Sequence, residues 1–166
     1  MNKIDIFTDG STLNNQYKGN RCGGCGVFFG DNDDRNLSIP LKETKNFKVT
    51  NQVAELTACI KALEKLEEDD IKKQITIYTD SVYVQNSMKK WAKNWIKNDW
   101  KGSTGKVVKN VELIKTLYQL TLKFNVNYIH VKAHKSEPGK DSKQYYYWYG
   151  NFMADKLAVE ASNLIN

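Results

Sequence analysis

The chain has 166 residues, of which 40% are hydrophobic and 27% are charged, and it carries a net charge of +6. This length suits one domain that buries a core without disulfides, so we expect residues 1–166 to form a single domain. No apolar run approaches the roughly 20 residues of a membrane span, and the N-terminus does not resemble a signal peptide. We therefore expect an intracellular protein, of cytoplasm or nucleus, without membrane attachment.

Three short strands are predicted near the N-terminus, where β-branched and aromatic residues gather at about 3–8, 26–29 and 36–41. Glycine and asparagine predict a loop over 13–21, between the first two strands. Because the strands follow one another closely, we expect them to form an antiparallel meander.

A helix is expected next, over about 51–68, with Thr50 or Asn51 as its N-cap. A fourth strand at 74–79 follows it, and a helical crossover of this kind joins parallel neighbours. The remaining predicted elements are short helices over 82–97, a helix over 110–123, a fifth strand at 127–131 and a last helix over 151–164. This order indicates an α/β fold, with a five-stranded mixed sheet, its first three strands antiparallel, flanked by helices.

Two of the predicted strands end in the same way, with Thr-Asp followed by a small residue. Asp9 ends the first of these runs and Asp80 the second. In open α/β sheets, ligands gather at the carboxyl ends of strands. Taken alone, Asp80 also fits a turn or a helix cap. Together the two carboxylates predict a site for Mg²⁺ or Mn²⁺, since oxygen-only ligands select these ions over zinc.

Glu55 is a carboxylate on the apolar arc of the predicted helix. At 100° per residue, it shares that arc with Leu56 and Cys59. A carboxylate that faces a core is costly unless it is paired or bound to metal. Glu55 is therefore predicted to join the same site, and the alternative is a local role near the positive end of the helix dipole.

Asp155 and His134 complete the candidate site. Asp155 lies early in the last predicted helix, where acids are common for dipole reasons, so it is a weak signal by itself. His134 follows the fifth strand, and a loop histidine near metal ions can transfer protons or assist the departure of product.

Positive charge is concentrated in one segment. Residues 89–109 contain seven lysines and one acid, together with Trp91, Trp95 and Trp100. A run of charge is usually a solvated helix face, but that explanation does not account for three interleaved tryptophans. Lysines suit phosphates and flat rings suit sugars or bases, so this segment is predicted to contact nucleic acid. We name it the basic arm, at about residues 88–110.

These motifs, taken in order, resemble type 1 of the ribonuclease H family. They are Thr8-Asp9-Gly10-Ser11, Thr50-Asn51-Gln52-Val53-Ala54-Glu55-Leu56, Tyr78-Thr79-Asp80-Ser81, His134, and Gly150-Asn151 with Ala154-Asp155. Each motif is weak alone, but their shared order and spacing are specific and cover nearly the whole chain. The basic arm is similar to the protrusion of the cellular enzymes. One departure is the long, aromatic-rich segment between His134 and Gly150, for which packing is favoured over contact with nucleic acid.

The resemblance implies a ribonuclease H-like fold and an endonuclease that cuts the RNA strand of RNA–DNA hybrids, leaving 5′-phosphate and 3′-hydroxyl ends. Two Mg²⁺ ions, or Mn²⁺ in their place, would be held by Asp9, Glu55, Asp80 and Asp155. His134 would assist proton transfer or product release. No protein partner is implied, and a monomer is expected.

The resemblance also implies which residues contact the RNA–DNA hybrid. Those matching the minor-groove positions are Gly10, Ser11, Thr12, Asn15, Asn51 and Gln52. Those matching a pocket for a DNA-strand phosphate are Lys48, Thr50 and Asn110, and those matching the channel for DNA sugars are Trp91, Trp95 and Ser103. Such a channel would reject double-stranded RNA, whose second strand carries 2′-hydroxyls.

Two alternatives remain at this point. A non-catalytic hybrid-binding module on the same fold would explain the basic arm, but not the retention of four strained acids. A resolvase or transposase core would explain acids on a sheet, but not the arm or the Thr-Asn-Gln opening of the Glu55 helix.

Overall fold

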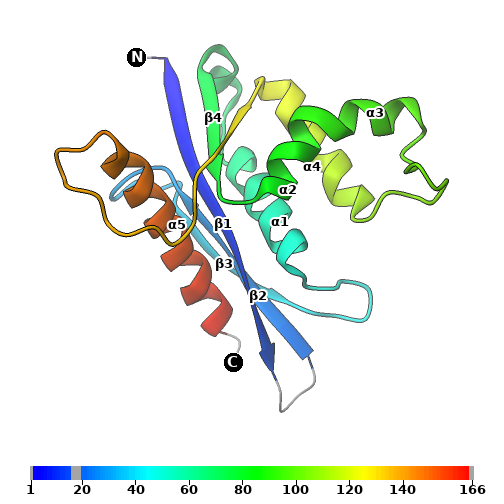
Figure 1. Ribbon diagram of the computed structural model, residues 1–166, viewed down its shortest axis with the longest axis horizontal. Helices are drawn as coiled ribbons and strands as arrows, with labels where there is room; N and C mark the ends of the chain where they lie inside the picture. The colour runs from blue at the N-terminus through cyan, green and yellow to red at the C-terminus, as the bar shows by residue number, and fades with distance from the viewer. Residues whose placement is uncertain (1, 16–19, 165–166) are drawn as a thin grey trace.

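A five-stranded mixed sheet forms the centre of the molecule (Figure 1). The computed structural model describes residues 2–15 and 20–164. The sheet order is β3-β2-β1-β4-β5, and the strands are β1 (Lys3–Asn15), β2 (Asn20–Phe28), β3 (Leu37–Lys42), β4 (Gln74–Thr79) and β5 (Asn127–His130). The first three strands pair antiparallel, whereas β4 runs parallel to both β1 and β5. The predicted fold class and strand directions are confirmed.

The β1–β2 pair is longer than the sequence pattern predicts. A loop was expected over 13–21, but Leu13 pairs with Cys22 and Asn14 with Arg21. The prediction is therefore wrong over the described part of this segment. Glycine and asparagine are poor strand formers, yet a paired neighbour satisfies the backbone hydrogen-bonding groups of any residue, and this pairing outweighs local propensity.

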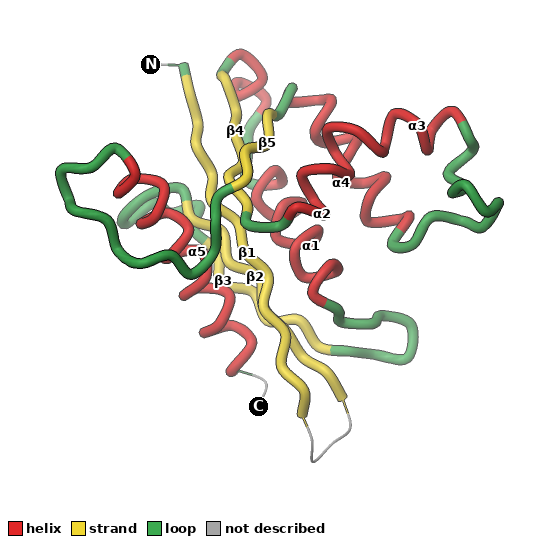
Figure 2. Tube along the Cα trace, viewed as in Figure 1, coloured by secondary structure: helices red, strands yellow, loops and turns green. Residues whose placement is uncertain are grey.

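Helices cover both faces of the sheet, with α5 on one side and α1 and α4 on the other (Figure 2). The helices are α1 (Asn51–Glu64), α2 (Val82–Asn86), α3 (Ala92–Lys97), α4 (Val111–Phe124) and α5 (Gln144–Asn163). A 3₁₀ turn, η1 (Glu68–Lys72), precedes β4, and a π-helical turn, η2 (Ser87–Trp91), joins α2 to α3. Thr50 is the N-cap of α1, and its hydroxyl accepts a hydrogen bond from the Val53 amide.

Two predicted helix boundaries are wrong. The first helix ends at Glu64 rather than 68, and the last begins at Gln144 rather than 151. The aromatic residues ahead of Gly150 thus form helix instead of loop. Within that helix Tyr145 stacks on Tyr149 at 5.9 Å between ring centroids, and such i,i+4 ring pairs stabilise a helix that propensity alone does not predict.

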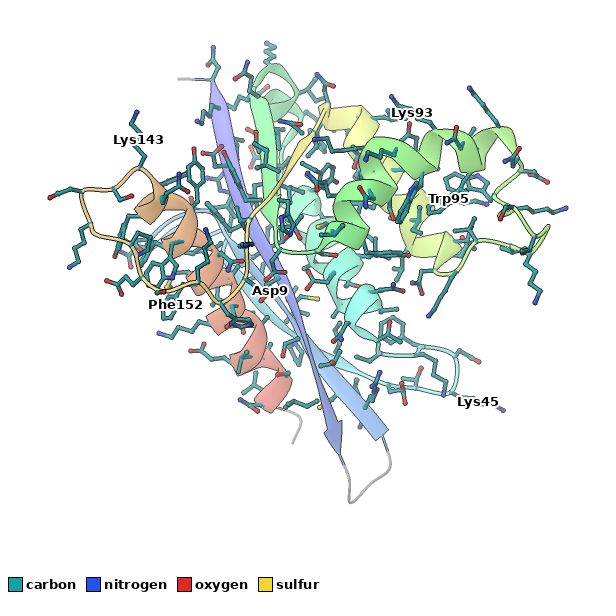
Figure 3. All side chains as sticks on the ribbon, in the orientation of Figure 1. Asp9, Lys45, Lys93, Trp95, Lys143 and Phe152 are labelled. Carbon is teal, nitrogen blue, oxygen red and sulfur yellow. The ribbon has the colours of Figure 1, made fainter. Side chains whose placement is uncertain are left out.

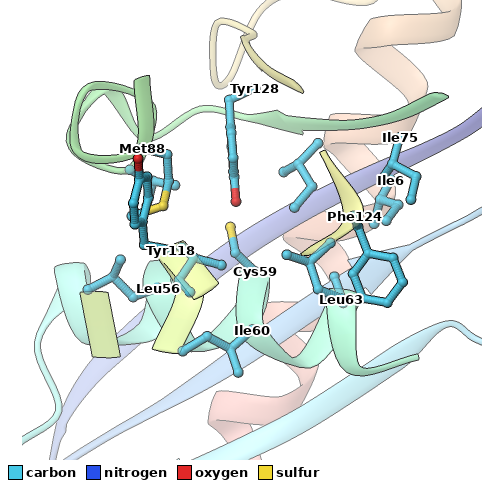
Figure 4. Close-up of a cluster of buried hydrophobic side chains, with 14 of the residues drawn as sticks. Ile6, Leu56, Cys59, Ile60, Leu63, Ile75, Met88, Tyr118, Phe124 and Tyr128 are labelled. Carbon is cyan, nitrogen blue, oxygen red and sulfur yellow. The ribbon is translucent and has the colours of Figure 1, made fainter. Parts of the chain in front are cut away.

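The main core lies between the sheet and the α1–α4 layer (Figure 4). Ile6, Leu56 and Ile77 are fully buried there. Tyr128 of β5 points toward Cys59 of α1, and its hydroxyl lies 2.7 Å from the Thr121 hydroxyl. This bond satisfies the polar end of a buried ring, so β5 is anchored to α4.

Glycines in β1 and β2 allow both helical layers to approach the sheet closely. A Cβ atom placed on Gly10 would lie 2.6 Å from the backbone of Ala54 in α1, and one on Gly26 would collide with the Ala154 carbonyl in α5. Larger residues at either position would push the facing helix outward. The contact at Gly10 therefore fixes the position of Glu55, the neighbour of Ala54, relative to the sheet. The contact at Gly26 does the same for Asp155, the neighbour of Ala154.

Candidate active site

Three carboxylates from separate elements meet at one edge of the sheet. Asp9 lies on β1, Glu55 on α1 and Asp80 directly after β4, and each offers an oxygen within 4.8 Å of the other two. The parallel register of β1 and β4 pairs Thr8 with Thr79, which places the two following aspartates side by side. This juxtaposition is the one that the sequence predicts.

Burial and like charge dominate the electrostatics of this cluster. Asp9 is only 4% exposed. Desolvation, followed by repulsion from Glu55 and Asp80, raises the pKa of Asp9 far above its ordinary value. Desolvation, followed by repulsion from Asp80, likewise raises the pKa of Glu55. Three acids held in this way favour either bound protons or a bound cation.

A Glu55 oxygen of this cluster lacks a hydrogen-bond partner in the part of the chain that the structure describes. Oε2 of Glu55 is buried and makes no hydrogen bond to the described residues. A buried carboxylate oxygen without a donor is costly, and a cation would satisfy it. Because the ligand set is oxygen only and the three side chains converge, the residues fit a hard ion such as Mg²⁺ or Mn²⁺.

Asp155 and His134 stand next to this cluster. The Asp155 side chain on α5 lies close enough to Asp9 to help raise the pKa of that residue. His134 is exposed in the loop after β5, with a left-handed backbone (φ 54°), and its charge acts on Asp80. Both predicted residues are therefore near the three acids, although their roles stay predictions.

Residues predicted to contact nucleic acid form a polar surface along the start of α1. The Thr12 hydroxyl donates a 2.6 Å hydrogen bond to Asn51, and the Asn110 amide lies 3.4 Å from Gln52. These hydrogen bonds connect Thr12 to Asn51, which is 39 positions away in the chain, and Gln52 to Asn110, which is 58 positions away. The Ser11 hydroxyl instead faces Ser162 on α5, on the other side of the sheet.

The basic arm projects from the body beside this surface, and Figure 3 shows Trp95 and Lys93 on it, with Asp9 near the centre of the molecule. The rings of Trp91 and Trp95 lie 5.8 Å apart, and Trp91 is 36% exposed. Ser103 and Lys48 are exposed on loops. The predicted contact Asn15 ends β1, and its side chain lies outside the described part of the structure.

Tyr83 is a residue of this surface that the sequence pattern did not reveal. Its hydroxyl lies 3.3 Å from the Asn110 amide, and its ring packs edge-on against Trp91 at 6.2 Å. Tyr83 therefore connects the start of α4 to the basic arm. Its position three residues after Asp80 was the available signal, but a tyrosine in a helix opening is not distinctive without the fold.

Comparison with known proteins agrees with this arrangement. The model of the RNase H family matches residues 1–163. A ribonuclease H of Schizosaccharomyces pombe is 40% identical over 92% of this chain and 50% of its own length. A ribonuclease H of Ruthia magnifica subsp. Calyptogena magnifica is 38% identical over the whole of this chain and 99% of its own length. The chain thus spans about half of the yeast relative and nearly all of the bacterial one.

A solved structure has a similar fold. The foamy viral protease–reverse transcriptase in complex with dsDNA superimposes with a TM-score of 0.72 at 26% identity, covering 96% of this chain and 93% of the viral one. Among the helices that the structure describes here, none has the length and apolar character needed to cross a membrane.

Proposed function

This chain belongs to the RNase H family, and from that premise we propose that it is an endonuclease that hydrolyses the RNA strand of RNA–DNA hybrids. The observation that carries the proposal is the meeting of Asp9, Glu55 and Asp80 at the edge of the sheet. A family member that merely bound hybrids would gain nothing from three mutually repelling acids, since the burial and like charge that raise the pKa values of Asp9 and Glu55 also make these carboxylates costly to keep together.

Asp9, Glu55, Asp80 and Asp155 are the residues that would hold two divalent ions, Mg²⁺ or Mn²⁺. When bound, such ions would supply activation of the attacking water and charge stabilisation at the departing 3′ oxygen, and the products would carry 5′-phosphate and 3′-hydroxyl ends. Oε2 of Glu55, which has no hydrogen-bond partner among residues 2–15 and 20–164, would be one of the ligand atoms.

The protein groups around the acids would orient the substrate and handle its protons. Burial of Asp9 and the close contact at Gly10 hold the acids in place before substrate binds. His134, exposed and close to Asp80, would give a proton to the leaving oxygen or assist release of product.

Substrate choice follows from the surface beside the acids. The Thr12–Asn51 pair and Gln52 offer hydrogen-bonding groups for ribose 2′-hydroxyls, which distinguish RNA from DNA. The other strand would pass Asn110 and then the rings of Trp91 and Trp95, while lysines of the arm meet its phosphates. A single chain carries all of these groups, so the proposed enzyme acts as a monomer.

One oligonucleotide sequence in four forms tests the proposal: an RNA–DNA hybrid, an RNA duplex, a DNA duplex and single-stranded RNA. Each is incubated with the protein in Mg²⁺, with and without EDTA. Cleavage confined to the RNA strand of the hybrid and lost in EDTA is the expected result. Hybrid binding without cleavage in Mg²⁺ or Mn²⁺ would overturn it in favour of a binding module.

A further inference from the structure

A cavity of about 760 Å³ lies next to the carboxylate site and has no part in the proposed cleavage. It is bounded by β5, by the loop from 131 to 143 and by the first turn of α5. Its volume falls within the range of small-molecule sites, roughly 300–1,000 Å³. We name it the loop pocket, and the lining residues used below are Tyr78, His130, Lys132, Lys135, Tyr147 and Trp148.

The aromatic rings of the loop pocket are held in place. Trp148 stacks on Phe152 at 5.2 Å, and its indole nitrogen donates a 2.9 Å hydrogen bond to the Lys135 carbonyl. Tyr147 packs against Tyr78 at 5.3 Å and remains 36% exposed. Rings fixed before a ligand arrives lose little conformational entropy on binding, which favours stacking with another flat ring.

The charge of the loop pocket favours an anion. Lys132, Lys135 and His130 line it together with a single acid, Glu137. Both lysines are exposed, and neither forms a salt bridge within the described residues. A ligand with a flat ring and a negative group would match the rings and the lysines at once, and a nucleotide has both.

The loop pocket also lies close to the carboxylate site. Tyr78 of β4 precedes Asp80 by two residues, and His134 stands between the two pocket lysines in sequence. The loop itself runs across the sheet from β5 to α5 (Figure 2). A strand engaged at the carboxylates therefore needs to travel only a short distance to reach the pocket.

We propose that the loop pocket binds one unpaired nucleotide of a strand that extends beyond the hybrid, with its base against Tyr147 and Trp148 and its phosphate near Lys132 and Lys135. A paired base is already stacked in the duplex, so only an unpaired base is free to enter. This inference rests on the proposed function, because it concerns an overhanging part of the same substrate.

The test compares a blunt RNA–DNA hybrid with hybrids of the same sequence that carry a short single-stranded extension at one of the four strand ends. Binding to the whole protein is measured by fluorescence anisotropy in EDTA. We expect an extension at one end to tighten binding about tenfold, within the range of one stacked base. The double variant Lys132→Ala/Lys135→Ala and the variant Tyr147→Leu should each lose this advantage.

A matched control is available in the same loop. Lys140→Ala/Lys143→Ala removes the same charge from residues that do not line the pocket, and Figure 3 shows Lys143 pointing away from the molecule. This variant should keep the advantage. Equal affinity for blunt and extended hybrids, or an advantage that survives in the pocket variants, would overturn the inference. Failure to cleave even the blunt hybrid in Mg²⁺ would instead overturn the proposed function, and the inference with it.

Discussion

The carboxylate site and the basic arm contain the two opposite concentrations of charge in this molecule, and they are assembled differently. The acids come from β1, α1, the end of β4 and α5; of the three that meet at the sheet edge, Asp9 is buried and Glu55 and Asp80 are partly buried. The lysines and tryptophans of the arm come from one continuous segment and are mostly exposed. The site thus depends on packing throughout the domain, whereas the arm depends on packing only where it joins the body.

This difference implies that chemistry and substrate binding can be separated by mutation. A change at the site should act on the reaction and on the electrostatic cost of folding, because its charges are desolvated. A change on the arm should act mainly on affinity, because its lysines and much of the Trp91 ring already face solvent.

The largest expected effect is the loss of cleavage in Asp9→Asn. The amide keeps the shape of the side chain but removes the negative charge nearest the centre of the cluster, so metal affinity and cleavage should fall together by several orders of magnitude. Hybrid binding in EDTA should stay equal or become tighter, since the neutral amide cannot repel phosphate. Asp34→Asn, on an exposed turn, is the matched control, and cleavage retained by Asp9→Asn would contradict the metal assignment.

Substitutions in the basic arm should weaken hybrid binding and leave cleavage nearly unchanged. Trp91→Ala and Trp95→Ala should each weaken hybrid binding about five- to hundredfold, the range for one lost stacking ring, with little change in cleavage at saturating substrate. Ile96→Ala, on the same helix, removes exposed apolar surface without a ring and serves as the control. Unchanged affinity in the tryptophan variants would remove the arm from the substrate site.

A third prediction concerns the packing that holds Asp155 in place. Gly26→Ala puts a methyl group against the Ala154 carbonyl, so α5 must move outward. We expect a stability loss of about 1–3 kcal/mol and a Tm lower by about 2–4 °C for each kcal/mol, with reduced cleavage. Gly139→Ala, where a Cβ meets nothing within 4 Å, should leave both unchanged. Normal cleavage by a destabilised Gly26→Ala protein would contradict a role of Asp155 in the reaction.

The smallest expected effect is on stability as a function of pH. Folding raises the pKa values of Asp9, Glu55 and Asp80, mainly by desolvation, so the folded protein holds protons that the unfolded chain releases near pH 4. In EDTA, the free energy of unfolding contributed by these groups should therefore be fully present below about pH 4 and should be lost as the pH rises, through about 8 for Glu55 and higher still for Asp9.

Thermal melts at several pH values, with and without Mg²⁺, measure this dependence of stability on pH. Near neutral pH, Asp9→Asn should melt above the parent protein in EDTA by about 2–4 °C, equivalent to about 1 kcal/mol. Mg²⁺ should raise the Tm of the parent protein and leave that of the variant unchanged. A parent protein that became more stable in EDTA as the pH rose would contradict the electrostatic account of the site.

Much of the site could be predicted from the sequence because its signals are local. Asp9 and Asp80 each end a run of strand residues, and Glu55 interrupts the apolar arc of a helix, so the positions follow from periodicity alone. The basic arm could be predicted for the same reason, since its lysines and tryptophans are contiguous. Asp155 was predicted only as a weak signal strengthened by the family resemblance, and Tyr83 was not predicted, because their positions beside the site and beside the neighbouring surface depend on the fold.

The order of strands and helices, the mixed sheet and the residues of the carboxylate cluster could be predicted from sequence patterns, because hydrophobic periodicity and the residues at strand ends are local properties of the chain. The extension of β1 and β2, the early start of α5 and the loop pocket could not be predicted in this way. Each of these depends on contacts between distant segments, such as the Leu13–Cys22 pairing and the bond from Trp148 to Lys135. Local propensity contains no information about such partners, and their energies outweigh it.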